Sequence, residues 1–388
     1  MEAVKVIDER TTMDYSAYHG DACVVTRGIP SDSIHFEIYS PPFSSLFSYT
    51  DSPKDLGNSA DDGEFLEHFA YLVPELYRIL MPGRLMAVHC MNLPCTIERN
   101  GYIGIRDFRG DLIRLFLGND GLLLARAHEA LVIRAALAEL QGDIKRSIRL
   151  QDAALVIQED LQSHPGKDGF IYHSEVVIWK DPLTAATRTH ALGLAHKQIV
   201  KDSTRCRQGI PDYLVVMGKP GVNPEPVSHT PRGFDRYIGS EPEPNVDRNN
   251  NPALNKYSHL VWQRYASPVW FDINQSDTLQ RESAREDEDQ KHVCPLQKGV
   301  VARALELWTN PRDIVFTPFG GIGTEGYVAL EMGRRAVCVE LKGSYFNQLV
   351  RNLNSVLESR SQDRLELHED PTLGEDQWDF LDTVEVEI

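Results

Sequence analysis

The chain has 388 residues, with 40 Lys and Arg against 57 Asp and Glu, so its formal net charge is −17. Hydrophobic residues make up 41% and charged residues 25%, which excludes disorder over most of the length. The length predicts two or three domains, or one large domain with insertions. The acidic balance argues against a general nucleic-acid coat protein, because such a protein would be basic overall.

No signal peptide or membrane span is expected. The N-terminus has no apolar core of the secretory kind, and no run reaches the ~18 apolar residues of a spanning helix. The six cysteines are scattered, without a CxxC pair or a Cys/His cluster at zinc-ligand spacing. We therefore expect free thiols, no metal site and a cytoplasmic protein.

Strand-like and helix-like segments alternate along the chain. Strands are predicted over 34–39, 85–89, 171–179 and 212–217, with a helix over 64–80 that ends at Met81-Pro82-Gly83. The last third predicts a helix over 298–308, a strand over 313–317, a helix over 324–332, a strand over 336–340 and a helix over 345–357. This alternation indicates an α/β fold with a largely parallel sheet.

Residues 119–167 differ from their surroundings. They are rich in Ala, Leu, Ile, Arg and Glu, and they carry apolar residues at helical spacing: Ile133, Leu137, Leu140, Ile144 and Ile148. We expect one long helix or a helical hairpin inserted into the α/β body. Three roles stay open: a packed structural insertion, a homodimer contact through the apolar stripe, or phosphate contacts through Lys145, Arg146 and Arg149.

A glycine-rich turn joins a predicted strand to a predicted helix at Thr317-Pro-Phe-Gly-Gly-Ile-Gly-Thr324. Glycines let the backbone approach a ligand closely, and the helix N-terminus favours a negative group. Glu340, at the end of the next strand, can accept both hydroxyls of a ribose. The glycine turn together with this acid indicates a nucleotide or S-adenosylmethionine site. A P-loop is excluded, because the turn lacks the GK[ST] motif.

A second segment, Ser40-Pro41-Pro42-Phe43, follows the strand over 34–39. The prolines stiffen the loop and remove backbone donors, so its carbonyls can only accept hydrogen bonds. Ser40 and the Pro41 carbonyl could accept from an exocyclic amine while Phe43 stacks on the ring that carries it. Alone, the tetrapeptide would be a plain proline turn beside a core Phe.

Together these segments resemble the S-adenosylmethionine-dependent DNA amino-methyltransferases of the β type, in which the catalytic loop precedes the cofactor loop. Leu80–Arg84, Val176–Lys180 and Lys291–Leu296 are similar to further motifs of that family, and several stretches resemble its phage and prophage branch. The resemblance implies a Rossmann-like methyltransferase fold with circularly permuted motif order. Thr317 and Ile322 depart from the pattern, where Asp and Ser are usual.

The resemblance also assigns the site residues. The catalytic residues would be Ser40, Pro41, Pro42 and Phe43. S-adenosylmethionine would be bound by Asp21, His292, Pro295, Thr317, Pro318, Phe319, Gly320, Gly321, Gly323, Thr324 and Glu340. Double-stranded DNA would be contacted by Arg106, Arg109, Arg188, Lys197, Lys201, Arg205 and Arg207.

Ser at the first position of the catalytic loop favours transfer to the N4 amine of a cytosine flipped out of DNA. Adenine N6 is the alternative, since both bases present a similar amidine edge. A methyltransferase-like DNA-binding protein without turnover is a reading of another class, motivated by Thr317 and Ile322.

The resemblance divides the chain as follows: catalytic half 1–118, helical insertion 119–167, core strands and basic segment 168–218, target-recognition region 219–290, cofactor-binding half 291–357 and acidic tail 358–388. Aromatic residues at 230–271 could contact bases or form a small core. Residues 361–388 hold ten acidic residues and one Arg, so they carry −9 of the −17 and leave −8 for the rest. We hypothesise that this tail competes with DNA for the basic groove.

Overall fold

The structure is a computed structural model. It describes residues 6–43, 59, 62–95, 101–117, 132–133, 135–151, 155, 169–183, 196–206, 208–229, 232–279 and 295–369. Within these ranges no helix is long and apolar enough to cross a membrane. Each cysteine in them carries a free thiol, as predicted, and Cys294 lies outside them.

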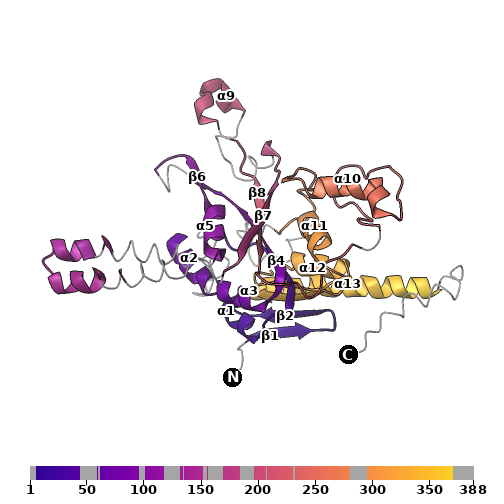
Figure 1. Cartoon of the computed structure of the whole chain (residues 1–388), viewed down its shortest axis with the longest axis horizontal. Helices are drawn as coiled ribbons and strands as arrows, with labels where there is room; N and C mark the ends of the chain where they lie inside the picture. Colours follow the sequence, from indigo (N-terminus) through magenta and orange to yellow (C-terminus); the bar gives the residue numbers. More distant parts are fainter. Residues whose placement is uncertain are drawn as a thin grey trace.

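A nine-stranded sheet forms the centre of the molecule (Figure 1). In spatial order its strands are β1 (Asp8–Thr11), β2 (Tyr15–His19), β11 (Arg335–Glu340), β10 (Ile314–Thr317), β3 (Ile34–Tyr39), β4 (Leu80–Met91), β8 (Asp212–Gly218), β7 (Ile171–Ile178) and β9 (Val269–Trp270). The strands from β2 to β4 run parallel to one another, and β1 and β8 are antiparallel to their neighbours. The largely parallel sheet predicted from the sequence is therefore confirmed.

Helices cover both faces of this sheet. On one face the core contains residues of α11 (Lys298–Trp308), α12 (Thr324–Glu331) and α13 (Gly343–Glu369). On the other it contains residues of α1 (Ala22–Val25), α2 (Asp62–Ala70), α3 (Val73–Ile79) and α5 (Phe108–Phe116). This three-layer α/β/α arrangement is the predicted Rossmann-like fold. Its motif order is permuted as expected, because the strand of the Ser40 loop, β3, precedes the strand of the glycine loop, β10.

Short elements complete the described chain. They are the hairpin β5 (Leu93–Cys95) and β6 (Gly104–Arg106), the helices α9 (Lys197–Lys201) and α10 (Lys256–Tyr265), and the 3-10 turns η1 (Thr26–Gly28), η5 (Ser203–Arg205) and η6 (Pro252–Leu254). Figure 1 shows α9 and β6 beyond the sheet, above β8, and α10 on the side of α11.

Three element boundaries differ from the prediction. The single helix expected over 64–80 is two helices, because Pro74 lacks an N–H and fits only the first turn of a new helix, α3. Strand β4 starts at Leu80 rather than Leu85 and runs through the Met81-Pro82-Gly83 turn, where the Gly83 N–H donates to the Lys219 carbonyl at 3.0 Å. Helix α13 continues to Glu369 rather than ending near Leu357.

The aromatic-rich segment between β8 and α11 has a core of its own. Phe234, Tyr257, Val261 and Tyr265 are buried together, so the small-core alternative holds for these aromatics. Arg303 of α11 holds this segment against the helix. Its guanidinium is fully buried and lies over the rings of Tyr265 and Trp270. It donates hydrogen bonds to both carboxylate oxygens of Asp272, at 2.8 and 2.9 Å.

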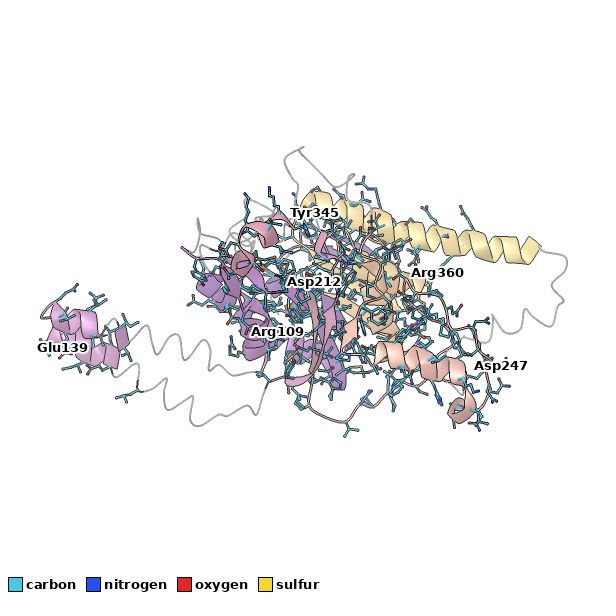
Figure 2. The ribbon with its side chains drawn as sticks, turned by 90° about the horizontal axis from the view of Figure 1, so that it is seen from above. Arg109, Glu139, Asp212, Asp247, Tyr345 and Arg360 are labelled. Atoms are coloured by element: carbon cyan, nitrogen blue, oxygen red, sulfur yellow. The ribbon has the colours of Figure 1, made fainter. Side chains whose placement is uncertain are left out.

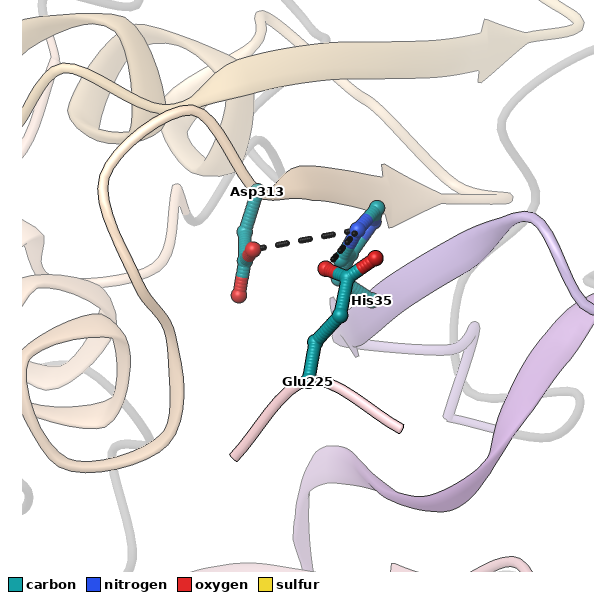
Figure 3. Close-up of side chains that lie close together, drawn as sticks. All are labelled: His35, Glu225 and Asp313. Carbon is teal, nitrogen blue, oxygen red and sulfur yellow. Dashed lines mark hydrogen bonds and ion pairs between the residues drawn. The ribbon is translucent and has the colours of Figure 1, made fainter. Parts of the chain in front are cut away.

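A polar cluster lies at the amino ends of β3 and β10 (Figure 3). His35 Nε2 is 3.2 Å from a carboxylate oxygen of Glu225 and 3.8 Å from one of Asp313. The Ile314 N–H donates to His35 Nδ1 at 3.2 Å, and Arg84, itself buried, is 3.1 Å from Asp313. Because His35 and Arg84 both lie within ion-pair distance of these carboxylates, we call this cluster the ion-pair lock.

The described part of the insertion forms a helical hairpin. Residues 135–140 and 144–151 are helical and are joined by a turn in which Gly142 has a φ of +77°. Small residues face inward (Ala135, Ala138 and Ser147), whereas Ile133, Leu137, Leu140, Ile144 and Ile148 are exposed. Figures 1 and 2 show this hairpin, which carries Glu139, away from the sheet.

Candidate active site

The strand order reverses between β10 and β3. From β10 the chain passes through α12 to β11 on one side, and from β3 it passes through α2 and α3 to β4 on the other. In open parallel sheets this reversal leaves a crevice at the carboxyl ends of the two strands, where ligands bind. The two loops singled out in the sequence, Ser40–Phe43 and Pro318–Gly323, leave the sheet at these two adjacent ends.

Aromatic contacts join the two loops from beneath. The ring of Phe319, in the glycine loop, packs edge-on against Tyr39 at the end of β3, with 5.8 Å between centroids. It makes a second edge contact with Phe69 of α2, also at 5.8 Å. Both Tyr39 and Phe69 are fully buried. The loops are therefore fixed relative to each other by the core.

Backbone hydrogen bonds, within the loop and to β11, fix the glycine loop. The Gly320 N–H donates to the Val339 carbonyl and the Gly323 N–H donates to the Gly320 carbonyl, both at 2.7 Å. Gly321 and Gly323 have φ values of +53° and +90°, which other residues adopt only with strain. A Cβ on Gly320 would lie 2.7 Å from Leu349 Cδ1 and 3.2 Å from the Val339 oxygen.

Glu340 orders the loop from the next strand. Its Oε2 accepts from the Gly321 N–H at 2.7 Å, and its Oε1 accepts from the Lys342 N–H at 2.8 Å. A carboxylate can only accept hydrogen bonds, so Glu340 orders the loop purely as an acceptor. Glu340 is only half-buried, in keeping with a role at the surface of the crevice.

Asp21 lies beside Glu340, because the Gly20 N–H donates to the Glu340 carbonyl at 2.9 Å. The Asp21 side chain caps α1 by accepting from the Cys23 N–H at 3.0 Å. Among the predicted cofactor residues, Asp21, Glu340 and 317–324 thus gather at the ends of neighbouring strands. Pro295 precedes α11, and His292 lies outside the described residues.

The two departures from the family pattern have different surroundings. Ile322 is buried with Tyr345, and its carbonyl accepts from Asn352 Nδ2 at 2.7 Å, so its side chain belongs to the packing behind the loop. Thr317 is 1% exposed, and its Oγ1 has no hydrogen-bond partner among the described residues. A buried hydroxyl without a partner at the end of β10, and a glycine loop whose Gly321 faces open space, fit a small polar ligand such as the adenosine and amino-acid parts of S-adenosylmethionine.

The Ser40 loop opens onto a chain of polar side chains. Ser40 Oγ is 3.1 Å from His89 Nδ1, His89 Nε2 is 3.1 Å from Asp212 Oδ2, and Asp212 Oδ1 is 2.6 Å from Lys180 Nζ. His89 and Asp212 are buried, on β4 and β8, whereas the Lys180 side chain is 22% exposed. Burial would raise the pKa of Asp212, but the facing His89 and Lys180 outweigh it and hold that pKa below its ordinary value.

Phe43 closes the other side of this chain. Its ring centroid is 6.4 Å from that of His89 and 6.4 Å from that of Phe108, the latter edge-on, and it is half-buried. Pro41 is buried and Pro42 is half-buried. The four predicted catalytic residues thus form one wall of the crevice.

The predicted DNA-contacting residues are brought together only in part. Arg109 donates to both carboxylate oxygens of Glu175, at 2.8 and 3.0 Å, and lies over the ring of Tyr213; Arg106 is 3.5 Å from Asp111. Figure 2 shows Arg109 and Asp212 within the central body. Lys197 and Lys201 lie exposed on α9. Arg188, Arg207 and the side chain of Arg205 fall outside the described residues.

Sequence reasoning assigned His89 no specific contact and did not select Asp212 or Lys180. Their joint position depends on β8 running antiparallel to β4 and β7, which places the start of β8 beside the ends of the other two. Strand patterns do not reveal that pairing. The usable signal was that Ser40, His89 and Lys180 each follow or end a predicted strand.

Comparison with known proteins identifies the family of this chain. The family model described as DNA methylase, for N6 and N4 amino-methyltransferases, matches residues 34–351. The chain is 28% identical over 109 residues to the DNA adenine methyltransferase YhdJ of Escherichia coli K12, and 31% identical over 65 residues to the type II methyltransferase M1.MboII of Moraxella bovis. These stretches cover 28% and 17% of this chain, and 33% and 25% of the two relatives.

Two solved structures of low sequence identity are also similar to this chain. A protein of Thermus thermophilus described as a DNA modification methylase, in complex with S-adenosyl-L-methionine, matches with 17% identity and a TM-score of 0.49 over 89% of this chain and 94% of that chain. The cytosine-N4-specific PvuII DNA methyltransferase matches with 14% identity and a TM-score of 0.48 over 91% and 97%. With the family model spanning both loops and the sheet between them, the chain belongs to the N6/N4 DNA methylase family.

Proposed function

We propose that this protein transfers a methyl group from S-adenosylmethionine to the exocyclic N4 amine of a cytosine turned out of double-stranded DNA. One observation carries the proposal: the Ser40–Phe43 loop and the glycine loop with Glu340 leave the sheet at adjacent strand ends, and the Tyr39–Phe319 contact at 5.8 Å joins them. A methyl donor and an amine held by these two loops would lie side by side.

The cofactor half of the crevice would be built from Asp21, Glu340 and the loop 317–324. Asp21 and Glu340 would accept hydrogen bonds from the adenosine part, and the loop with Pro295 and His292 would hold the amino-acid part. When bound, S-adenosylmethionine supplies an electrophilic methyl group on a positively charged sulfur. The carboxylates and the buried loop around it would favour that positive charge.

The base half would be built from the Ser40 loop. An exocyclic amine is a poor nucleophile, because its lone pair is delocalised into the ring. Ser40 Oγ and the Pro41 carbonyl would accept its hydrogens and so localise the lone pair on nitrogen, while Phe43 stacks on the ring and excludes water. Catalysis would rest mainly on positioning and polar stabilisation.

The base must leave the double helix to reach a crevice at the end of a sheet. We propose that the exposed Lys197 and Lys201 of α9 contact phosphates, because α9 extends beyond the sheet (Figure 1). Arg106 and Arg109 lie near Phe43 through α5 but are paired with carboxylates. They would contact DNA only through guanidinium N–H groups that do not bond these carboxylates.

Adenine N6 is the second candidate, favoured by the likeness to a relative named as an adenine methyltransferase. The two products are distinguished by incubating unmethylated DNA with the protein and cofactor, digesting it to nucleosides and identifying the methylated one by mass. We expect N4-methylcytosine, and N6-methyladenine alone would overturn the assignment from Ser40. Ser40→Ala and Phe43→Ala should abolish transfer and retain cofactor binding, while Phe43→Tyr, which keeps the stacking ring, should retain transfer.

We also propose that the exposed apolar stripe of the insertion is covered by a second copy of the chain. Leu137, Leu140 and Ile144 are more than half exposed in the hairpin, at 51%, 85% and 54%. Contiguous exposed apolar side chains of this kind mark interaction sites. Sedimentation equilibrium should show a dimer for the intact chain and a monomer for Leu137→Lys with Ile144→Lys; a monomeric intact chain would refute the contact.

A further inference from the structure

The chain Ser40–His89–Asp212–Lys180 raises a question that the methyl-transfer geometry leaves open, namely where the proton of the amine goes. An NH2 group that gains a methyl group must lose one proton to become a secondary amine. The chain begins at the Ser40 hydroxyl, the side-chain group of the catalytic loop that would touch the amine. It then leads through two buried side chains to an ammonium at the surface.

Asp212 determines which nitrogen of His89 carries the proton. The Asp212 carboxylate is 2% exposed and, when ionised, can only accept hydrogen bonds. Its Oδ2 lies 3.1 Å from His89 Nε2, and its Oδ1 lies 2.6 Å from Lys180 Nζ. His89 Nε2 makes no hydrogen bond of good geometry with the described residues, so its contact with Asp212 is an ion-pair distance of 3.1 Å. The negative charge at that distance favours a neutral His89 that carries its proton on Nε2. Nδ1 is then an acceptor, 3.1 Å from Ser40 Oγ.

We propose that His89 is the proton acceptor for the amine, acting through the Ser40 hydroxyl, and that Asp212 is the positioning residue that keeps Nδ1 free for it. This inference rests on the proposed amino-methyl transfer. It goes beyond that proposal because it gives His89, Asp212 and Lys180 a role that packing alone does not require.

The step balances as follows. The amine lone pair forms the N–C bond as the S–C bond breaks, and that bond's electron pair stays on sulfur. One amine N–H bond breaks as Ser40 Oγ takes the proton, and the original Ser40 proton forms a bond to His89 Nδ1. His89 becomes an imidazolium whose positive charge faces the Asp212 carboxylate, and it returns the proton to water once the product has left.

Charged groups surround His89 from three elements. Asp212 lies on β8, Lys180 follows β7, and Arg109 of α5, paired with Glu175 of β7, lies over the ring of Tyr213. Ser40 and Phe43 come from the loop after β3. Asp212 is the charged group in direct contact with His89, so its replacement is the direct test of this arrangement.

The test uses the full-length protein and three variants. His89→Asn places a carboxamide near Ser40 that cannot take up the proton. Asp212→Asn preserves shape but offers an N–H to His89 Nε2, which reverses the tautomer. His35→Gln is the matched control, because it removes a half-buried histidine from the opposite end of β3, within the ion-pair lock.

Two measurements are made. Nitrogen-15 spectra of ring-labelled histidine should show His89 with Nε2 protonated in the wild type and Nδ1 protonated in Asp212→Asn. Single-turnover methylation should fall by about 10² or more in His89→Asn, with cofactor affinity within about twofold of wild type by calorimetry. In Asp212→Asn the rate should fall, and His35→Gln should change neither the rate nor the His89 signal.

The outcomes separate the two proposals. A wild-type protein that methylates no base refutes the proposed function and the proton route together. Wild-type methylation with His89→Asn retaining a third or more of the rate overturns the proton route alone. A wild-type spectrum with Nδ1 protonated overturns it as well, whatever the rates. A purely structural role predicts lost stability in both variants, with Nε2 of His89 still protonated in Asp212→Asn.

Discussion

Gly320 is the residue at which the glycine loop comes closest to its supporting helix. A Cβ there would lie 2.7 Å from Leu349 Cδ1 and 3.2 Å from the Val339 oxygen, so Gly320→Ala must displace the loop. Overpacking of this kind costs about 1–3 kcal/mol, and loop displacement removes the backbone geometry that holds the ligand. We expect calorimetry to show S-adenosylmethionine binding about tenfold weaker or worse.

Gly209 offers the matched control. The nearest atom to a Cβ added there is the Pro182 Cα, at 4.0 Å, so an alanine fits without strain. Gly209→Ala should bind the cofactor like the wild type. Equal affinities for all three proteins would show that the loop does not contact the ligand, and would remove the observation on which the cofactor assignment depends.

Glu325 follows the glycine loop directly and is buried in the first turn of α12. Burial raises the pKa of its carboxyl to about 8, and the nearby Glu340 adds to this. In the unfolded chain the pKa of this carboxyl has its ordinary value of 4.5. Between pH 4.5 and about 8 the folded state therefore keeps a proton that the unfolded state releases. Stability should therefore fall as pH rises from about 4.5 to about 8.

Glu325→Gln removes that titration. In scanning calorimetry between pH 5 and 8, its Tm should fall less with rising pH than the wild-type Tm does. Glu37, buried in β3 with both carboxylate oxygens unpartnered among the described residues, acts in the same direction, because burial also raises its pKa. Parallel curves for wild type and Glu325→Gln would mean that Glu325 is ionised in the folded protein.

Among the elements, strands and helices with a clear period were predictable and their boundaries less so. The strand 34–39 and the helix 298–308 coincide with β3 and α11, because alternation and a buried helical stripe mark them in the sequence. The split between α2 and α3 depends on where Pro74 falls in a turn. The antiparallel insertion of β8 depends on long-range pairing that no local pattern carries.

The 232–279 segment is attached to α11 mainly through one residue, Arg303. Its guanidinium is wholly buried between Tyr265 and Trp270 and paired with Asp272 through two hydrogen bonds. Arg303→Lys keeps the charge but loses the planar fork, so it leaves a buried carboxylate poorly satisfied. We expect a loss of about 2–4 kcal/mol in urea unfolding.

Arg236→Lys is the control from the same segment. The Arg236 side chain is 48% exposed and meets the buried Glu306 at 2.8 Å. Because water reaches Arg236 but not Arg303, the lysine variant should lose less stability at Arg236 than at Arg303. Similar losses for the two variants would show that burial at Arg303 does not decide its contribution.

At the scale of the whole molecule, the net charge of −17 is unevenly distributed, and the structure sharpens where the excess begins. Helix α13 continues to Glu369, so the acidic segment that follows it is shorter than the predicted tail. Residues 371–388 hold six acidic residues and no basic one, and they lie outside the described residues. A negative segment attached to a DNA-binding protein competes with phosphates for its basic groups.

Deleting residues 371–388 while keeping α13 intact should therefore tighten binding to non-specific DNA at low salt. We expect the tightening at about 50 mM salt, and its loss at several hundred millimolar, because salt screens exposed charges. Fluorescence anisotropy with a labelled duplex of unrelated sequence measures both. A version in which the six acidic residues are replaced by Asn and Gln separates charge from length: it should bind like the deletion. If it binds like the intact chain, then the segment does not act through its charge.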